Sequence, residues 1–193
     1  MINIVTILGT RRPGNYTAKA LSLVQEELDN MPKIHHQAID PGNLQLAFPG
    51  EESKDADAEF LRETVSSASG IIIATPEYHG SFSSVTKLII ENLGFPSVLA
   101  AKPVALLGVA GGQIGAIKSL EQLRSVCSHV GAIVLPGTVS VPNVRTVFDA
   151  EGNCSDSRIE KRIRGVAKNL MDYLHTHVCP RYTLEEMVRE DRS

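Results

Sequence analysis

The chain lacks the features that mark several broad classes of protein. Its 193 residues include no tryptophan, three cysteines and only 5% aromatic residues. The cysteines, Cys127, Cys154 and Cys179, are odd in number and widely spaced, which indicates neither a disulfide framework nor a zinc site. Reduced thiols fit a cytoplasmic protein best, and we therefore expect a cytoplasmic location.

Neither charge nor hydrophobicity is concentrated in long runs. The net charge of −3 gives no sign of nucleic acid or an anionic membrane as the main partner. No apolar run reaches the roughly 18 residues of a membrane helix, and residues 1–4 lack the basic stretch of a secretion signal. With 42% hydrophobic residues, the chain predicts one globular domain over residues 1–178, followed by a short tail over 179–193.

The apolar residues that are present alternate between two periods. Short apolar runs predict strands over residues 2–8, 34–39, 71–75, 104–109 and 132–135. Apolar residues at helical spacing predict helices over 18–28, 61–68, 82–89, 117–127 and 159–173. Ser155 or Asp156 is a suitable N-cap for the last of these helices.

Strands that are apolar on both faces are typical of a parallel sheet with helices on both sides. The prediction is therefore an α/β fold in three layers, with a doubly wound five-stranded parallel sheet. A ligand of such a sheet binds beyond the carboxyl ends of the strands, at the point where the strand order reverses. The loops after the first, third and fourth strands are therefore the candidate site.

The first of these loops, residues 9–17, suits an anion. It leads from a strand into a helix, whose free N–H groups and dipole attract negative charge. Thr10, Asn15 and Thr17 are candidate donors to phosphate oxygens, and Arg12 adds positive charge. Neither the dinucleotide-binding fingerprint nor a Walker loop is present. The alternative is a capped turn with surface arginines.

The other two loops suit a flat ring. Residues 75–81 form a tight turn that contains Pro76 and Gly80, with Tyr78 able to cover part of a heterocycle. Residues 108–115 include Gly111 and Gly112, which allow a ligand to approach the main chain closely. Ordinary connecting turns are the alternative for each loop alone. Together, one phosphate loop and two ring loops at one edge indicate a mononucleotide such as FMN.

The same residues resemble the motifs of a known family, the NADPH-dependent FMN reductases. Residues 9–15 resemble the family's phosphate loop, Gly-Ser-x-Arg-x-x-Ser-x-Asn. Residues 75–81, Thr-Pro-Glu-Tyr-His-Gly-Ser, resemble its more specific Thr-Pro-Glu-Tyr-Asn-Gly-Ser turn, with His79 in place of asparagine. Residues 111–135 are similar to the family's third loop and following helix, so that the resemblance spans roughly residues 2–175.

The resemblance implies a fold, an activity and a site. It implies a flavodoxin-like fold that binds FMN and takes hydride from NADPH or NADH. It implies a ping-pong reaction with a small acceptor: flavin, a quinone, an azo or nitro compound, or chromate. No dedicated catalytic side chain or metal is implied. The FMN-binding residues that it implies are Thr10, Arg12, Asn15, Tyr16, Thr17, Pro76, Glu77, Tyr78, His79, Gly80, Gly111, Gly112 and Gln113.

Several residues allow more than one interpretation. Arg11 is the nearest spare cation for the 2′-phosphate of NADPH, and His79 places a titratable ring near the expected flavin. Family members commonly form homodimers or homotetramers through the third helix, for which Phe82, Val85, Ile89, Leu93 and Phe95 are either interface or core. An FMN-binding electron carrier or redox sensor is the alternative function, and a phosphate-binding module without flavin is a third.

Other residues carry less information about function. Cys127 lies on the apolar side of a predicted helix and is expected in the core. The pairs His35-His36 and His175-x-His177 lack the further ligands that a metal site needs.

Overall fold

A parallel β-sheet forms the centre of the molecule. The computed structural model describes residues 2–51, 55–180, 183 and 185. Its parallel strands are β1 (Ile2–Leu8), β2 (Ile34–Ile39), β3 (Gly70–Tyr78), β5 (Pro103–Val109), β6 (Ile133–Val134) and β7 (Val139–Val141). They lie in the order β2-β1-β3-β5, with β6 and then β7 pairing along the outer edge of β5. The short β4 (Ser81–Phe82) pairs antiparallel with the end of β3.

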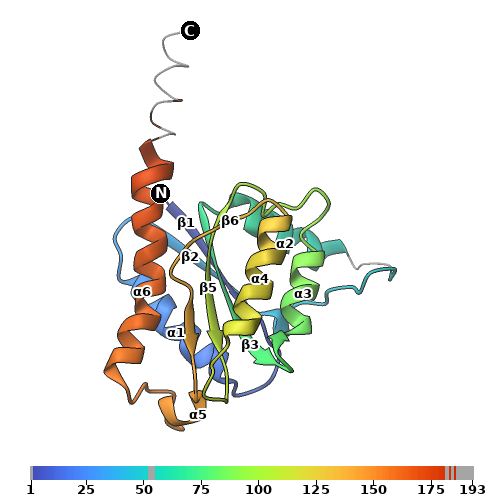
Figure 1. The fold of residues 1–193 in the computed structure, drawn as a ribbon. Coiled ribbons are helices and arrows are strands. Elements are labelled where there is room, and N and C mark those ends of the chain that lie inside the picture. The colour runs from blue at the N-terminus through green and yellow to red at the C-terminus, as the bar shows by residue number, and fades with distance from the viewer. Residues whose placement is uncertain (1, 52–54, 181–182, 184, 186–193) are drawn as a thin grey trace.

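Helices cover both faces of this sheet (Figure 1). The helical elements are α1 (Tyr16–Asp29), α2 (Asp55–Ser67), α3 (Ser84–Glu91), α4 (Ile117–His129), α5 (Val144–Val147) and α6 (Ser157–Tyr173), with a 3-10 turn η1 (Pro41–Asn43) and a π-helical turn η2 (Leu174–Val178). Helices α1 and α6 lie on one face, and α2, α3 and α4 on the other. This arrangement confirms the predicted three-layer α/β fold.

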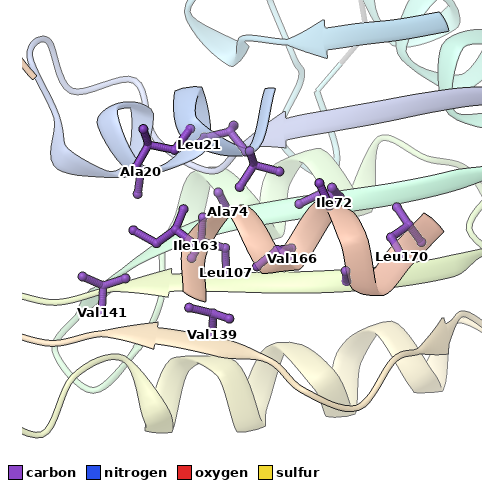
Figure 2. Close-up of a cluster of buried hydrophobic side chains, with 14 of the residues drawn as sticks. Ala20, Leu21, Ile72, Ala74, Leu107, Val139, Val141, Ile163, Val166 and Leu170 are labelled. Carbon is purple, nitrogen blue, oxygen red and sulfur yellow. The ribbon is translucent and has the colours of Figure 1, made fainter. Parts of the chain in front are cut away.

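The central strands are buried on both faces, as their apolar composition predicts. In β3, Ile72 and Ala74 face the α1 and α6 layer, whereas Ile71 and Ile73 face the opposite layer. Figure 2 shows the first of these clusters, in which side chains of α1 and α6 meet those of β3, β5 and β7. Alternation along one strand therefore joins the two halves of the core.

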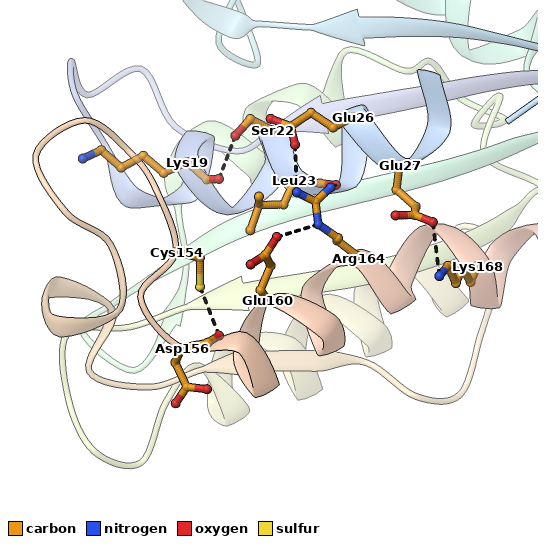
Figure 3. Close-up of polar contacts among 10 residues, drawn as sticks. All are labelled: Lys19, Ser22, Leu23, Glu26, Glu27, Cys154, Asp156, Glu160, Arg164 and Lys168. Atoms are coloured by element: carbon orange, nitrogen blue, oxygen red, sulfur yellow. Dashed lines mark hydrogen bonds and ion pairs between the residues drawn. The ribbon is translucent and has the colours of Figure 1, made fainter. Parts of the chain in front are cut away.

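Polar contacts orient α6 on α1 (Figure 3). The Arg164 guanidinium bridges the carboxylates of Glu160, at 2.8 Å, and Glu26, at 2.9 Å, and donates to the carbonyl of Leu23 at 3.1 Å. The Glu160 and Glu26 carboxylates raise the pKa of Arg164. Because these groups are partly exposed, we attribute most of the packing energy to the apolar cluster beneath them.

Two element boundaries differ from the prediction for physical reasons. The predicted strand over 132–135 is shorter and resumes as β7, because Pro136 has no N–H and Gly137 has a φ of 80°. The helix predicted from residue 82 begins at Ser84, since Ser83 caps it by accepting the N–H of Thr86. Asp156 is confirmed as the N-cap of α6. Most of the predicted tail, 179–193, lies outside the described residues.

Candidate functional site

The three predicted loops meet at one edge of the sheet, where β1, β3 and β5 end. Strands β1 and β3 are neighbours there, and the strand order reverses between them. A cavity of about 360 Å³ lies at this edge. Its lining is Arg12, Pro13, Gly14, Asn15, Tyr16, Thr17, Pro76, Glu77, Tyr78, Val109, Ala110, Gly111, Val144 and Arg145.

Two polar side chains of the first loop hold its shape. The Asn15 side-chain oxygen accepts the N–H of Ala18 at 2.6 Å, and its amide nitrogen donates to the carbonyl of Arg12 at 2.7 Å. Thr10 is buried, and its hydroxyl accepts the N–H of Arg12 at 3.2 Å. Thr10 is not among the lining residues. Both side chains therefore make local hydrogen bonds in a capped turn, although both were predicted as phosphate donors.

The remaining groups of the first loop suit a phosphate. Tyr16 and Thr17 open α1, and backbone N–H groups of a first helical turn have no intrahelical acceptor. The Thr17 side chain is 1% exposed and lines the cavity. Arg12 is exposed and lines it too, and within the part of the chain that the structure describes its guanidinium has no partner. The helix N-terminus, a hydroxyl group and a cation thus lie together at the cavity, an arrangement that suits an anion.

Buried hydroxyl groups connect the first and second loops. The Gly9 carbonyl accepts hydrogen bonds from the hydroxyls of Ser83 and Thr86, the latter at 3.3 Å. The Thr86 hydroxyl also donates to that of Thr75 at 3.1 Å, and Thr75 accepts the N–H of Ser83. All three side chains are buried. This network fixes the end of β1 against the start of α3.

The second loop turns through His79 and Gly80. Both have a positive φ, 51° and 75°, and they join Tyr78 to Ser81 of β4 in a two-residue hairpin. His79 is exposed and is not among the lining residues, whereas Tyr78 and Pro76 are. Turns with two positive φ values favour Asn-Gly, which explains why asparagine suits position 79.

We therefore expect His79→Asn to stabilise the protein by about 0.5 to 1 kcal/mol, because asparagine adopts the left-handed conformation more readily. Thermal unfolding of the purified variant measures this effect. His79→Ala is the matched control, since it removes the ring without adding asparagine's preference. A melting temperature of His79→Asn at or below that of the wild type would contradict the assignment of this turn.

Glu77 links the second loop to α4. Its carboxylate accepts the N–H of Ser119, in the first turn of α4, at 3.2 Å. The Gln122 side chain of α4 donates to the carbonyl of Gly80 at 3.0 Å and accepts the hydroxyl of Ser81 at 2.7 Å. Glu77 thus caps a helix while it lines the cavity, a role that a negative charge at a helix N-terminus favours.

Of the three residues predicted in the third loop, one lines the cavity, and Val109 and Ala110 of the same loop line it without having been predicted. Gly111 lines the cavity, but Gly112 and Gln113 are exposed and do not. Gly115 is needed for another reason, because its φ is 76° and a Cβ there would lie 2.3 Å from the hydroxyl oxygen of Ser140. That hydroxyl accepts the N–H of Ala116 at 2.8 Å and so anchors the loop to β7.

A fourth loop, after β7, also reaches the cavity and was missed. Val144 and Arg145 of α5 line it. The alternation of apolar and polar residues at Val139, Ser140 and Val141 could have predicted β7. Pro136 and Gly137 just before it indicated instead that the strand had ended. Once β7 is recognised, its carboxyl end falls at the ligand edge of the sheet.

The remaining candidates lie away from the cavity. Arg11 is exposed and does not line it. Cys127 is in the core, as predicted, and burial raises its pKa to about 12. His36 bonds to Thr6 at 2.9 Å, and His177 packs against Tyr173. Among the described residues, no three histidine, cysteine or acidic side chains cluster as metal ligands would.

The residues of the cavity fit FMN. The first-turn N–H groups, Thr17 and Arg12 form a donor set suited to a phosphate. Pro76, Tyr78 and Gly111 provide the flat apolar and backbone surfaces that a ring requires. The volume lies within the range of small-molecule sites, about 300 to 1,000 Å³.

No helix in the described part of the chain combines the length and the apolar character that crossing a bilayer requires.

Known proteins resemble this chain in sequence and in fold. An NADPH azoreductase of Bacillus sp. (strain OY1-2) is 29% identical over 178 residues, which cover 91% of this chain and 94% of that protein. A 2-hydroxy-1,4-benzoquinone reductase of Burkholderia sp. is 29% identical over 125 residues, 60% of this chain and 66% of that protein. The solved structure of FerB, an NAD(P)H:(acceptor) oxidoreductase from Paracoccus denitrificans, has a TM-score of 0.74 at 18% identity and covers 92% of this chain and 99% of FerB.

A family model for NADPH-dependent FMN reductases matches residues 2–146. This match confirms the resemblance seen in the sequence, and with it the prediction of an oxidoreductase that uses FMN and NAD(P)H. The structural likeness confirms the flavodoxin-like fold. The chain belongs to the NADPH-dependent FMN reductase family.

Proposed function

We propose that the protein transfers electrons from NADPH or NADH, through bound FMN, to a small acceptor. When bound, FMN would accept hydride from the nicotinamide and supply electrons to the acceptor. The observation that carries the proposal is the convergence of a phosphate loop and two ring loops on one 360 Å³ cavity. Eight of the thirteen predicted residues line it: Arg12, Asn15, Tyr16, Thr17, Pro76, Glu77, Tyr78 and Gly111. We propose all of these as binding residues except Asn15, whose side chain caps α1 and holds the loop.

Thr10, His79, Gly80, Gly112 and Gln113 lie outside the lining of the cavity. Thr10 holds the first loop, and His79 with Gly80 forms the hairpin that presents Tyr78. The carbonyl of Gly112 accepts the N–H of Asn143 at 3.1 Å and so joins the third loop to the segment before α5. We assign positioning roles to Thr10, His79, Gly80 and Gly112.

The rim of the cavity favours a flat, apolar acceptor. Tyr78 lines the cavity and is 41% exposed. Exposed apolar side chains beside a site suit aromatic substrates. The Bacillus azoreductase and the Burkholderia benzoquinone reductase act on such compounds by name. We therefore rank quinones and azo compounds before nitro compounds, free flavin and chromate.

We propose ping-pong kinetics, because donor and acceptor would bind in turn at this one cavity. Initial rates measured at several fixed acceptor concentrations should give parallel double-reciprocal lines. Intersecting lines would contradict the shared site.

The test of the function is anaerobic stopped-flow absorbance. The FMN-loaded protein is mixed with NADPH and, separately, with NADH, and the loss of the flavin band near 450 nm is followed. Rapid bleaching supports the proposal and ranks the two donors. An FMN-binding protein that does not bleach would be the electron carrier or redox sensor, and a protein that does not bind FMN would contradict both.

We also propose that the chain forms a homodimer through α3, α4 and the segment after α3. A groove of about 580 Å³ lies between these helices, lined by Ile90, Phe95, Val126 and Val130 among others. Phe95 is fully exposed, whereas Ile89 and Leu93, two of the predicted interface residues, belong to the core. An exposed phenylalanine beside an apolar groove suits insertion into a second copy.

We expect Phe95→Ser to raise the dimer dissociation constant at least tenfold, since burying a phenylalanine side chain is worth about 1.5 to 3 kcal/mol. Sedimentation velocity over a concentration series measures it. Phe60→Ser is the matched control, because Phe60 is partly exposed on α2 and does not line the groove. A wild type that stays monomeric at high concentration would contradict the proposed dimer.

A further inference from the structure

Two arginines from separate elements line the cavity. Arg12 belongs to the loop after β1, and Arg145 belongs to α5. Within residues 2–51, 55–180, 183 and 185, neither guanidinium has a hydrogen-bond or salt-bridge partner. The acidic residue of the lining, Glu77, accepts the N–H of Ser119. The cavity therefore carries an excess of positive charge that the described residues leave without a paired carboxylate.

The backbone that carries Arg145 is held firmly against the third loop. The N–H of Val144 donates to the carbonyl of Ala110 at 3.0 Å, and that of Asn143 to the carbonyl of Gly112 at 3.1 Å. Val144 and Val147, on either side of Arg145, are each 4% exposed. Asn143 adopts the left-handed conformation, with a φ of 46°, that turns the chain into α5. These anchors hold the Arg145 backbone beside the cavity.

The Arg145 side chain lies against a glycine. A Cβ built at Gly111 would lie 3.9 Å from the Nε atom of Arg145. The guanidinium group therefore lies beside Gly111, another residue of the cavity lining. Arg11, the cation suggested by the sequence for a second phosphate, does not line the cavity.

We propose that Arg145 is a second phosphate-binding side chain of the cavity, separate from the phosphate loop at α1. A guanidinium binds phosphate oxygens through two parallel hydrogen bonds, and its charge does not titrate at physiological pH. The ligand group is a phosphate monoester, either the terminal phosphate of FMN or the 2′-phosphate of NADPH. The proposal rests on the proposed function, since it assigns a residue of the same site.

The test compares pairs of ligands that differ by one phosphate. Fluorescence titration of the apoprotein gives dissociation constants for FMN and for riboflavin. Calorimetric titration of the FMN-loaded protein gives them for 2′,5′-ADP and for 5′-AMP. Each is measured for the wild type, Arg145→Ala and Arg145→Lys. Arg158→Ala is the control, because Arg158 is also an exposed arginine but lies on α6 and lines a different hollow.

We expect Arg145→Ala to weaken the binding of one phosphate-bearing ligand, FMN or 2′,5′-ADP, about tenfold to a hundredfold. The binding of the matching ligand without that phosphate, riboflavin or 5′-AMP, should weaken less than twofold. Arg145→Lys should lie between, because it keeps the charge but not the paired donors. A loss confined to FMN assigns the FMN phosphate, and a loss confined to 2′,5′-ADP assigns the NADPH 2′-phosphate.

Two results would overturn the proposal. Equal weakening of FMN and riboflavin would show that Arg145 only shapes the cavity, and unchanged affinities for all four ligands would show that it binds no phosphate. In either case the wild-type protein would still bind FMN and be bleached by NADPH. Failure of this proposal can therefore be distinguished from failure of the proposed function.

Discussion

Gly9→Ala should lower the free energy of unfolding by about 3 kcal/mol, the upper part of the range for overpacking a buried site. A Cβ at Gly9 would lie 2.6 Å from the carbonyl oxygen of Ala74 and 2.1 Å from the Thr86 hydroxyl oxygen. The Thr86 side chain can rotate only by breaking its hydrogen bonds to Gly9 and Thr75. The Ala74 carbonyl belongs to β3 and accepts the N–H of Gly9 at 2.7 Å. Relief of the clash therefore has to separate β1 from β3.

Urea and thermal unfolding measure this loss, which should lower the melting temperature by about 6 to 12 °C for a chain of this size. FMN affinity should also fall, because the phosphate loop begins at Gly9. The control is Gly112→Ala, where a Cβ meets nothing within 4 Å and stability should change by less than about 0.5 kcal/mol. Equal stability of the two variants would mean that β1 and β3 are not held as described.

Arg12→Glu should weaken FMN binding by more than about a hundredfold and leave riboflavin binding nearly unchanged. The substitution removes a charge-assisted hydrogen bond, worth about 1.5 to 3 kcal/mol, and adds repulsion toward the phosphate. Because the Arg12 side chain is exposed, the melting temperature should stay close to that of the wild type. Fluorescence titration of the apoprotein with each flavin measures both affinities.

Arg11→Glu is the matched control for this charge reversal. It makes the same change one residue away, at a side chain that does not line the cavity, so solvent screening should limit its effect to less than about tenfold. If the two variants weakened FMN equally, the effect would come from net charge and not from a contact with Arg12. If riboflavin lost as much affinity as FMN, the phosphate would not be the group that Arg12 recognises.

Local patterns in the chain were sufficient to predict the layers of the fold and the edge of the sheet at which the cavity lies. The apolar runs of β1, β3 and β5 show burial on both faces, and only a sheet covered by helices on both sides provides that. Asp156 could be predicted as an N-cap because its side chain accepts hydrogen bonds only from the next few residues along the chain. The Thr-Pro-Glu-Tyr-His-Gly-Ser turn after β3 identified the family for the same reason, since its residue types are local.

Roles that depend on distant partners could not be read in this way. Glu77 caps a helix that begins forty residues further along the chain. Nothing near Glu77 in the sequence indicates that partner.

The sequence by itself therefore determined the α/β class, the positions of the main strands along the chain, the family and three of the loops at the cavity, because period and turn chemistry are local properties. Only the tertiary structure decided which side chains line the cavity. It moved Thr10 and His79 out of the lining and brought in Val144 and Arg145. Val144 and Arg145 could not be placed from the sequence because they follow β7. That strand exists only through its pairing with β5, a contact between segments some thirty residues apart.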